Sequence, residues 1–372
     1  MSLTSLATTR THGGNPWKLT REQKVSKDPI LDFSLDINPL GFPEIVRSVI
    51  LSHMDDLRCY PDPDALALRE AIARYHQLPL EMILPANGSA ELITLITRLP
   101  QARTILVIVP TFTEYAWAAK QAGAAVVSHA LEEGQGFQLD VSTQDWTERV
   151  RDADLVFLCN PNNPTGTVLS KEQVLGIAGQ CREHNCLLIV DEAYVEFTDQ
   201  PQDVTVLPEA RHYDNLVVLR SLTKFFAMPG LRLGYLVAAP SLVETLRAMQ
   251  QPWPLNTFSM VVGVELLTQV EYITRSRQCL RKLRDDFQRA ITEMPGLQPF
   301  PSAVNFTLCR IQTPTITASA LTQRLISQGI LIRNCDDFTG LEHGRFIRLA
   351  IGSQEDNKQL FSALHEALRH GR

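Results

Sequence analysis

One lysine follows directly on a run of apolar residues that is typical of a buried strand. Residues 216–219 form that run, and Ser221-Leu-Thr-Lys224 comes after it. Burying an unpaired ammonium is costly, and a lysine held at such a place can act as an amine nucleophile that forms an imine. A solvated loop lysine is the ordinary alternative, so the neighbouring motifs have to decide between the two.

An aspartate ends a second apolar run. Residues 187–191 read Leu-Leu-Ile-Val-Asp, and Tyr194 follows three residues later. A buried carboxylate needs a cationic or hydrogen-bonding partner. The protonated pyridine nitrogen of a cofactor would serve, and the pairing would keep the ring an effective electron sink. A helix-capping aspartate is the alternative for Asp191.

Two loop motifs also carry groups that could bind a ligand. Asn160-Pro-Asn-Asn163-Pro-Thr-Gly166 follows the apolar run 155–159, and its prolines favour a stiff turn that can aim an amide. Asn87-Gly-Ser89 precedes a predicted helix, where free backbone amides and a hydroxyl favour binding of a phosphate. A plain turn and an ordinary helix cap are the alternatives.

Taken together and in this order, the motifs resemble those of the fold-type-I pyridoxal-phosphate (PLP) enzymes of the class I and II aminotransferase group, over nearly the whole chain. The resemblance implies Lys224 as the catalytic residue that forms an imine with PLP. It also implies that Asp191 pairs with the pyridine nitrogen and that Asn163 and Tyr194 bond the ring's phenolic oxygen. The remaining implied PLP contacts are stacking by Phe112, phosphate binding by Gly88, Ser89, Ser221 and Arg232, and a phosphate contact from Tyr60 of a partner subunit in a homodimer.

Within the group, the resemblance is strongest to the threonine-phosphate decarboxylases of cobalamin biosynthesis and next to the histidinol-phosphate aminotransferases. The opening His12-Gly-Gly-Asn15 and the segment Ile330-Leu-Ile-Arg-Asn-Cys335 carry it. It implies PLP-dependent decarboxylation of L-threonine O-3-phosphate to (R)-1-aminopropan-2-yl phosphate. A histidinol-phosphate or related aminotransferase is the alternative. The implied residues for this small phosphorylated amino-acid substrate are His12, Gly13, Asp36, Asn163, Arg333 and Arg348.

Asp36 departs from this pattern, because the family's Ser-x-Asn-x-Asn-Pro run has asparagine where this chain has aspartate. A carboxylate beside a substrate phosphate is repulsive unless it is protonated, turned away or paired with an arginine.

The elements that must position these residues are predicted from the hydrophobic pattern. Between about residues 60 and 250, continuously apolar runs alternate with helical stretches, which favours an α/β fold with a mostly parallel sheet flanked by helices. Ligands then bind at the carboxyl ends of the strands. Residues 256–293 read as one long helical stretch, and the rest alternates as a small α+β C-terminal domain. We expect an N-terminal arm (1–40) packing with the small domain, a large PLP-binding domain (41–255), and a linking helix with the small domain (256–372).

The composition excludes several classes of function. The chain has 372 residues and a formal net charge of −6, so we expect no nucleic acid or membrane partner. The seven cysteines are scattered, and no second Cys/His pair accompanies Cys181 and Cys186 at zinc spacing, so we expect free thiols, no metal site and a cytoplasmic location. A PLP-binding transcriptional regulator would need a basic DNA-binding appendage, and the sequence shows none.

Overall fold

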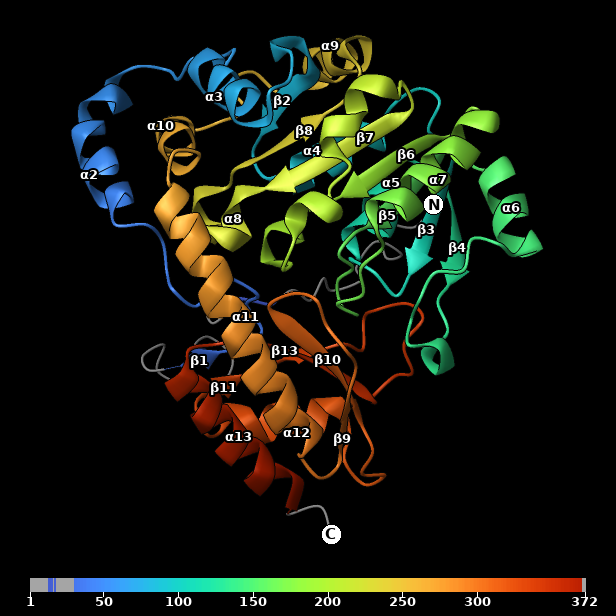
Figure 1. Cartoon of the computed structure of the whole chain (residues 1–372), viewed down its shortest axis with the longest axis vertical. Coiled ribbons are helices and arrows are strands. Elements are labelled where there is room, and N and C mark those ends of the chain that lie inside the picture. The colour runs from blue at the N-terminus through green and yellow to red at the C-terminus, as the bar shows by residue number, and fades with distance from the viewer. Residues whose placement is uncertain (1–12, 16, 18–29, 370–372) are drawn as a thin grey trace, which may run out of the picture.

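A seven-stranded sheet forms the frame of the molecule in the computed structural model, which describes residues 13–15, 17 and 30–369 (Figure 1). The strand order is β2-β8-β7-β6-β5-β3-β4, and every neighbouring pair is parallel except those made by β8. The strands are β2 (Ile83–Ala86), β3 (Thr104–Val109), β4 (Ala125–Ala130), β5 (Leu155–Cys159), β6 (Leu187–Asp191), β7 (Leu216–Ser221) and β8 (Gly234–Val237).

Helices cover both faces of this sheet, which explains why its inner strands are apolar except at their ends. One apolar layer joins the sheet to α4 (Ser89–Ile96), α5 (Glu114–Gln121) and α9 (Pro240–Met249). The opposite layer joins it to α3 (Leu66–His76), α6 (Gln144–Arg151), α7 (Lys171–Glu183) and α10 (Thr257–Leu266). The short helices α2 (Ile45–Ser52) and α8 (Leu222–Phe225) and the 3₁₀ turn η2 (Met54–Arg58) also belong to this part of the chain.

A smaller antiparallel sheet forms a second layer with its own apolar core. Its order is β12-β13-β10-β9, and α11 (Val270–Thr292) runs from the large sheet to this part of the molecule (Figure 1). Two further helices, α12 (Ala318–Ile326) and α13 (Gln354–Arg369), pack on it. The strands are β9 (Leu297–Pro299), β10 (Phe306–Ile311), β12 (Arg333–Asn334) and β13 (Phe346–Ala350).

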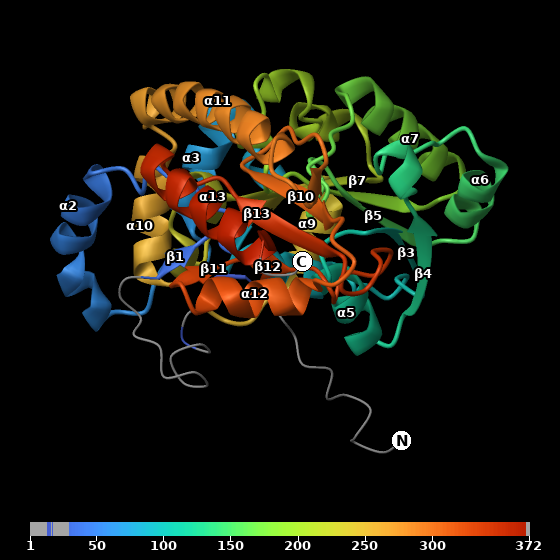
Figure 2. The same cartoon turned by 90° about the horizontal axis from the view of Figure 1, so that it is seen from below.

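The described part of the N-terminal segment joins the smaller layer. Strand β1 (Leu31–Asp32) pairs in parallel with β11 (Ile330–Leu331). A little further on, the side chain of Asn38 donates to the carbonyl of Phe225 (3.0 Å), and its backbone N–H donates to the carbonyl of Lys224 (3.1 Å). The carbonyl of Phe33 also accepts a hydrogen bond from the N–H of Ala350 on β13 (2.9 Å), so the segment contacts the smaller layer and α8 of the larger one. Figure 2 shows β1 beside β11 from below.

Two sequence expectations about elements were wrong. The helical stretch 256–293 is two helices, α10 and α11, which are separated at residues 267–269 without a proline or glycine to signal the break. The apolar pattern also predicts a single strand over residues 330–333, but the structure has two short strands there, because β11 pairs with β1 while β12 pairs with β13. Both differences depend on packing partners that are distant in sequence.

None of the helices among the described residues is long and apolar enough to cross a membrane.

Candidate active site

A cavity of about 360 Å³ opens at the carboxyl ends of β5, β6 and β7, between the two sheets. The N-terminal segment closes one side of it. Thirteen of the residues expected to bind a cofactor or substrate line this single cavity: Gly13, Asp36, Gly88, Ser89, Phe112, Asn163, Asp191, Tyr194, Ser221, Lys224, Arg232, Arg333 and Arg348.

At one end of the cavity the backbone approaches an arginine closely. Gly88 precedes α4 with φ of 78°, and a Cβ built on it would lie 2.7 Å from Nη2 of Arg232. The glycine therefore leaves the guanidinium beside the first N–H groups of the helix, where helix geometry favours an anion. Ser221 ends β7 nearby in the lining, and its hydroxyl shares a hydrogen bond with Thr223 (2.7 Å). This end combines the groups that bind a phosphate.

Deeper in the cavity, Asp191 lies buried at the end of β6. Its Oδ2 accepts a hydrogen bond from the hydroxyl of Tyr115 (2.7 Å), and its Oδ1 accepts one from the backbone N–H of Ala193 (3.0 Å). Burial raises the pKa of Asp191 above its ordinary value, and these two bonds only partly oppose the effect. A cationic ligand group at this carboxylate would stabilise its charge.

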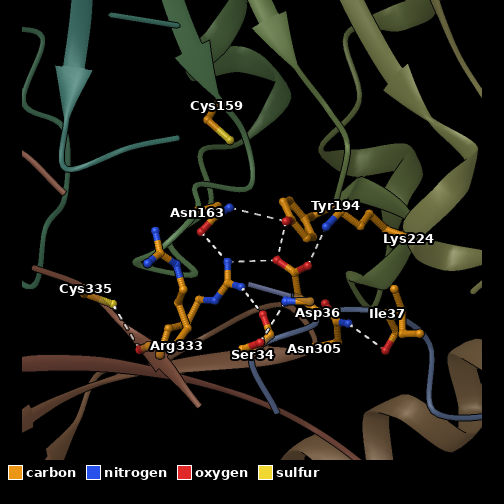
Figure 3. Close-up of polar contacts among 12 residues, drawn as sticks. Ser34, Asp36, Ile37, Cys159, Asn163, Tyr194, Lys224, Asn305, Arg333 and Cys335 are labelled. Atoms are coloured by element: carbon orange, nitrogen blue, oxygen red, sulfur yellow. Dashed lines mark hydrogen bonds and ion pairs between the residues drawn. The ribbon is translucent and has the colours of Figure 1, made fainter. Parts of the chain in front are cut away.

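Asp36 and Lys224 form an ion pair inside the cavity (Figure 3). Lys224 Nζ lies 2.5 Å from Asp36 Oδ1, and the hydroxyl of Tyr194 donates to Asp36 Oδ2 at 2.5 Å. Arg348 Nη1 lies 2.8 Å from the same Oδ2. Burial alone would raise the pKa of Asp36, but the charges of Arg348 and Lys224 outweigh it and hold the pKa below its ordinary value. Of the three ways to tolerate this carboxylate, pairing with an arginine is therefore the one observed.

The two arginines come from directly paired positions, Arg333 on β12 and Arg348 on β13. Each has an acidic partner. Arg333 Nη2 lies 2.7 Å from Asp337 Oδ2, and the Asp337 side chain is 27% exposed. Asp36, the partner of Arg348, is only 3% exposed at its side chain. Water therefore screens the first pair far more than the second.

Two expected residues do not belong to this cavity as described. Tyr60 lies outside it, is 78% exposed and stacks on Trp253 with ring centroids 4.4 Å apart. His12 lies outside the described residues, whereas its neighbour Gly13 lines the cavity. A Cβ on Gly13 would lie 2.1 Å from the carbonyl oxygen of Ser34, so only glycine fits there.

Sequence reasoning missed several residues of the cavity. Tyr115 comes three residues after Phe112, in the first turn of α5, and its closeness in the chain to that expected ring contact is the one signal that could have found it. Asp337, which pairs with Arg333 but does not line the cavity, was missed too, and it carries no signal beyond its charge. Cys159, at the end of β5, also lines the cavity, and burial raises the pKa of its thiol to about 12, so that it stays protonated.

The strand order, the cavity at the carboxyl ends of the strands, the buried Asp191 and the half-buried Lys224 can be compared with those of known proteins. The family model of class I and II aminotransferases matches residues 30–364. The chain belongs to this family. The family is PLP-dependent, and the fold-type-I architecture expected from the sequence is confirmed by the large and small sheets and by the similar solved structures.

Three relatives of this aminotransferase-family chain illustrate the range of activities among similar proteins. The threonine-phosphate decarboxylase of Salmonella typhimurium is 36% identical over 96% of each chain. The structure of a histidinol-phosphate aminotransferase from Clostridium acetobutylicum is 32% identical, with a TM-score of 0.85 over 92% of this chain and 100% of that one. The structure of an L-threonine-O-3-phosphate decarboxylase from Porphyromonas gingivalis is 26% identical, with a TM-score of 0.81 over 91% of this chain and 100% of that one. The resemblance to both subgroups noted in the sequence is therefore confirmed.

Proposed function

We propose that the cavity binds PLP, with Lys224 as the residue that attaches it. The end of the cavity formed by Gly88, Ser89, Ser221 and Arg232 suits the cofactor phosphate, because helix N–H groups and a guanidinium meet there. Asp191 suits the protonated pyridine nitrogen, since it is a buried carboxylate whose hydrogen bonds come from a neutral hydroxyl and a backbone N–H.

The remaining ring contacts follow from the same lining. The side-chain amide of Asn163 donates to the hydroxyl of Tyr194 (3.3 Å), and the two residues are assigned to the phenolic oxygen. Phe112 is assigned to the ring face. When bound, PLP supplies an electron sink for the bond that breaks at the substrate's Cα. This chain's residues determine which bond that is, because they orient the substrate.

We infer that the reaction is decarboxylation of L-threonine O-3-phosphate to (R)-1-aminopropan-2-yl phosphate, as part of cobalamin biosynthesis. The observation that carries the inference is the 36% identity to a threonine-phosphate decarboxylase over 96% of both chains. The cavity supports it, since it joins the attachment lysine to an arginine, Arg333, whose acidic partner is partly exposed. A substrate phosphate can compete with such a screened pair.

In this assignment the phosphate lies at Arg333 and at the backbone near Gly13, with His12 as the expected further contact. Arg348, the second arginine expected at the phosphate, is bound by Asp36. Lys224 is positioned by its contact with Asp36 and can donate a proton to Cα once CO2 has left.

Histidinol-phosphate aminotransferase is the second candidate, because a solved member of that subgroup is 32% identical over nearly all of this chain. That reaction needs a keto acid as amino acceptor and releases no CO2. The two candidates therefore differ in a product that can be measured directly.

The test offers the PLP-loaded protein O-phosphothreonine alone and, separately, histidinol phosphate with 2-oxoglutarate. We expect CO2 and aminopropanol phosphate from the first mixture and little glutamate from the second. Glutamate formation without CO2 release would assign the protein to the aminotransferases.

We also propose that the protein acts as a homodimer in which Tyr60 contacts the cofactor phosphate of the partner subunit. Several large apolar side chains, which we call the α2 surface, are exposed on α2, η2 and the segments beside them. An exposed apolar patch of this kind favours a protein interface. Its members are Phe42, Ile45, Leu51, Met54, Leu57, Tyr60 and Trp253.

A further inference from the structure

The guanidinium of Arg348 is already engaged by groups of the protein itself. Nη1 donates to Asn163 Oδ1 (2.6 Å) and lies 2.8 Å from Asp36 Oδ2, and Nη2 donates to the carbonyl of Ser34 (3.0 Å). Its Nε is buried from solvent. A carboxylate of the protein thus lies where a substrate carboxylate could pair with this arginine.

The Asp36 carboxylate is difficult to displace. It is 3% exposed, contacts Lys224 and Arg348 at 2.5 and 2.8 Å, and accepts the hydroxyl of Tyr194. Moving it away would leave a buried charge without partners, which costs far more than breaking an exposed pair. The pair of Arg333 with Asp337 differs in this respect, because Asp337 is 27% exposed.

We propose that Asp36 is a specificity-determining residue that selects decarboxylation by keeping the substrate's α-carboxylate away from Arg348. The inference rests on the proposed function and deepens it. An α-carboxylate held by Arg348 and Asn163 would be fixed in one orientation, and Asp36 both occupies that place and repels a second carboxylate there. The substrate carboxylate is then left to stand out of the plane of the cofactor ring.

That orientation decides which bond at Cα can break, since only the bond perpendicular to the ring plane passes its electrons into the ring. In the native protein the Cα–carboxylate bond breaks, CO2 leaves, and the electron pair returns to Cα as it takes up a proton. No external oxidant or keto acid is needed. With the carboxylate held at Arg348, the Cα–H bond would be perpendicular instead, and the amino group would be transferred to the cofactor.

The experiment compares Asp36→Asn with the native protein and with Asp199→Asn, which neutralises a carboxylate paired with Arg281 outside the cavity. All three are loaded with PLP, so that Lys224 is engaged by the cofactor. Acetate, a small carboxylate, is titrated into each, and binding is read from the absorbance of the cofactor. With O-phosphothreonine, CO2 release and conversion of the cofactor to its amine form are then counted.

We expect Asp36→Asn to lower the dissociation constant of acetate roughly tenfold and to raise the fraction of turnovers that end in amine transfer by a similar factor. Asp199→Asn should change neither the acetate affinity nor the fraction of amine transfer. The double variant Asp36→Asn/Arg348→Met should lose the gain in acetate binding, because the receiving arginine is gone. Asp36→Glu, which restores the charge, should move both readouts back toward the native values.

Equal acetate affinity in the native protein and Asp36→Asn would overturn the inference, as would a gain that persists in the double variant. If Asp36→Asn does not load with PLP, the acetate titration of cofactor-free protein by calorimetry gives the same comparison. If the native protein releases no CO2, the proposed function fails, while tighter acetate binding in Asp36→Asn would still show that Asp36 blocks Arg348.

Discussion

Asp36 and Asp191 are two buried carboxylates in one cavity whose pKa values are shifted in opposite directions. Burial raises the pKa of Asp191, and two hydrogen bonds and the charge of Lys224 only partly oppose the shift. Burial acts on Asp36 as well, but Arg348 and Lys224 reverse the shift. The two pKa shifts differ because the partners of the carboxylates differ, since both are buried. Asp191 is therefore the carboxylate whose charge a cationic ring would stabilise.

Tyr115 positions Asp191 through its hydroxyl, so Tyr115→Phe should weaken PLP binding. Loss of the hydrogen bond raises the pKa of Asp191 further, and the carboxylate then holds its charge less well against the pyridine nitrogen. We expect the dissociation constant of PLP to rise roughly tenfold, since a hydrogen bond to a charged group contributes about 1.5–3 kcal/mol. Absorbance titration of cofactor-free protein measures it.

The matched control is Tyr213→Phe, which removes a hydroxyl from a tyrosine that packs against Arg182 and does not line the cavity. It should leave PLP binding unchanged. An unaltered dissociation constant in Tyr115→Phe would show that the hydrogen bond does not support the cofactor.

At the residue scale, the sequence predicted which groups line the cavity but not how they pair. Asp36 could be identified as a departure from the family pattern, yet its contacts with Lys224 and Arg348 join segments 188 and 312 residues apart in the chain. Charge type is visible in a sequence, whereas such distant pairing depends on the complete fold. For the same reason the proton state of Asp36 could not be decided from the motif.

At the scale of elements, the continuous apolar runs predicted the inner strands well, because both faces of the sheet are covered. The expected strands 155–159 and 187–191 match β5 and β6, and the apolar run 216–219 lies within β7. The break between α10 and α11 and the separate pairing of β11 and β12 were missed. These features are set by neighbours such as β1, which no local pattern reveals.

His76, the last residue of α3, packs against β8. We expect the contact between these two elements to weaken in acid. Its Nε2 lies 2.6 Å from the hydroxyl of Tyr235, and burial, with help from the charge of Arg220, lowers the pKa of His76 to about 3. The unfolded chain therefore binds a proton between about pH 6.5 and 3 that the folded chain does not. Stability must fall as pH falls through this range.

We expect the free energy of unfolding of the native protein to decrease by about 1–2 kcal/mol through His76 when the pH is lowered from 6.5 to 5. Denaturant titrations at the two pH values should show a smaller decrease for His76→Gln. His365→Gln, at an exposed position on α13, is the control, and its free energy of unfolding should decrease as much as that of the native protein. An identical decrease in His76→Gln would assign the acid sensitivity to other groups.

At the scale of the whole molecule, the large sheet carries the proposed cofactor groups, while β12 and β13 carry the proposed substrate arginines. We propose that these layers act as the large and small domains expected from the sequence, with the N-terminal segment between them. The net charge of −6 plays no part in anion binding here, since each anion is assigned to a few placed groups.

The α2 surface leads to a prediction about assembly. Leu57 is 54% exposed and Leu51 is 72% exposed, and α2 lies at the edge of the molecule in Figure 1. If a second copy covers this surface, Leu57→Glu should turn a dimer into a monomer in analytical ultracentrifugation, because a buried unpaired carboxylate is costly. PLP should also bind less tightly, since Tyr60 of the partner subunit would be lost.

Gln359→Glu, at an exposed position on α13 in the small domain, adds the same charge elsewhere and should remain a dimer. A monomeric native protein with full PLP binding would contradict the shared site.

The central claim is that this cavity removes a carboxylate from a phosphorylated amino acid with PLP alone. The most direct measurement is the number of CO2 molecules released per PLP-loaded protein when O-phosphothreonine is the sole substrate. We predict many turnovers, with aminopropanol phosphate formed in equal amount and the cofactor unchanged. No CO2, or a single turnover that leaves the cofactor in its amine form until a keto acid is added, would contradict the claim.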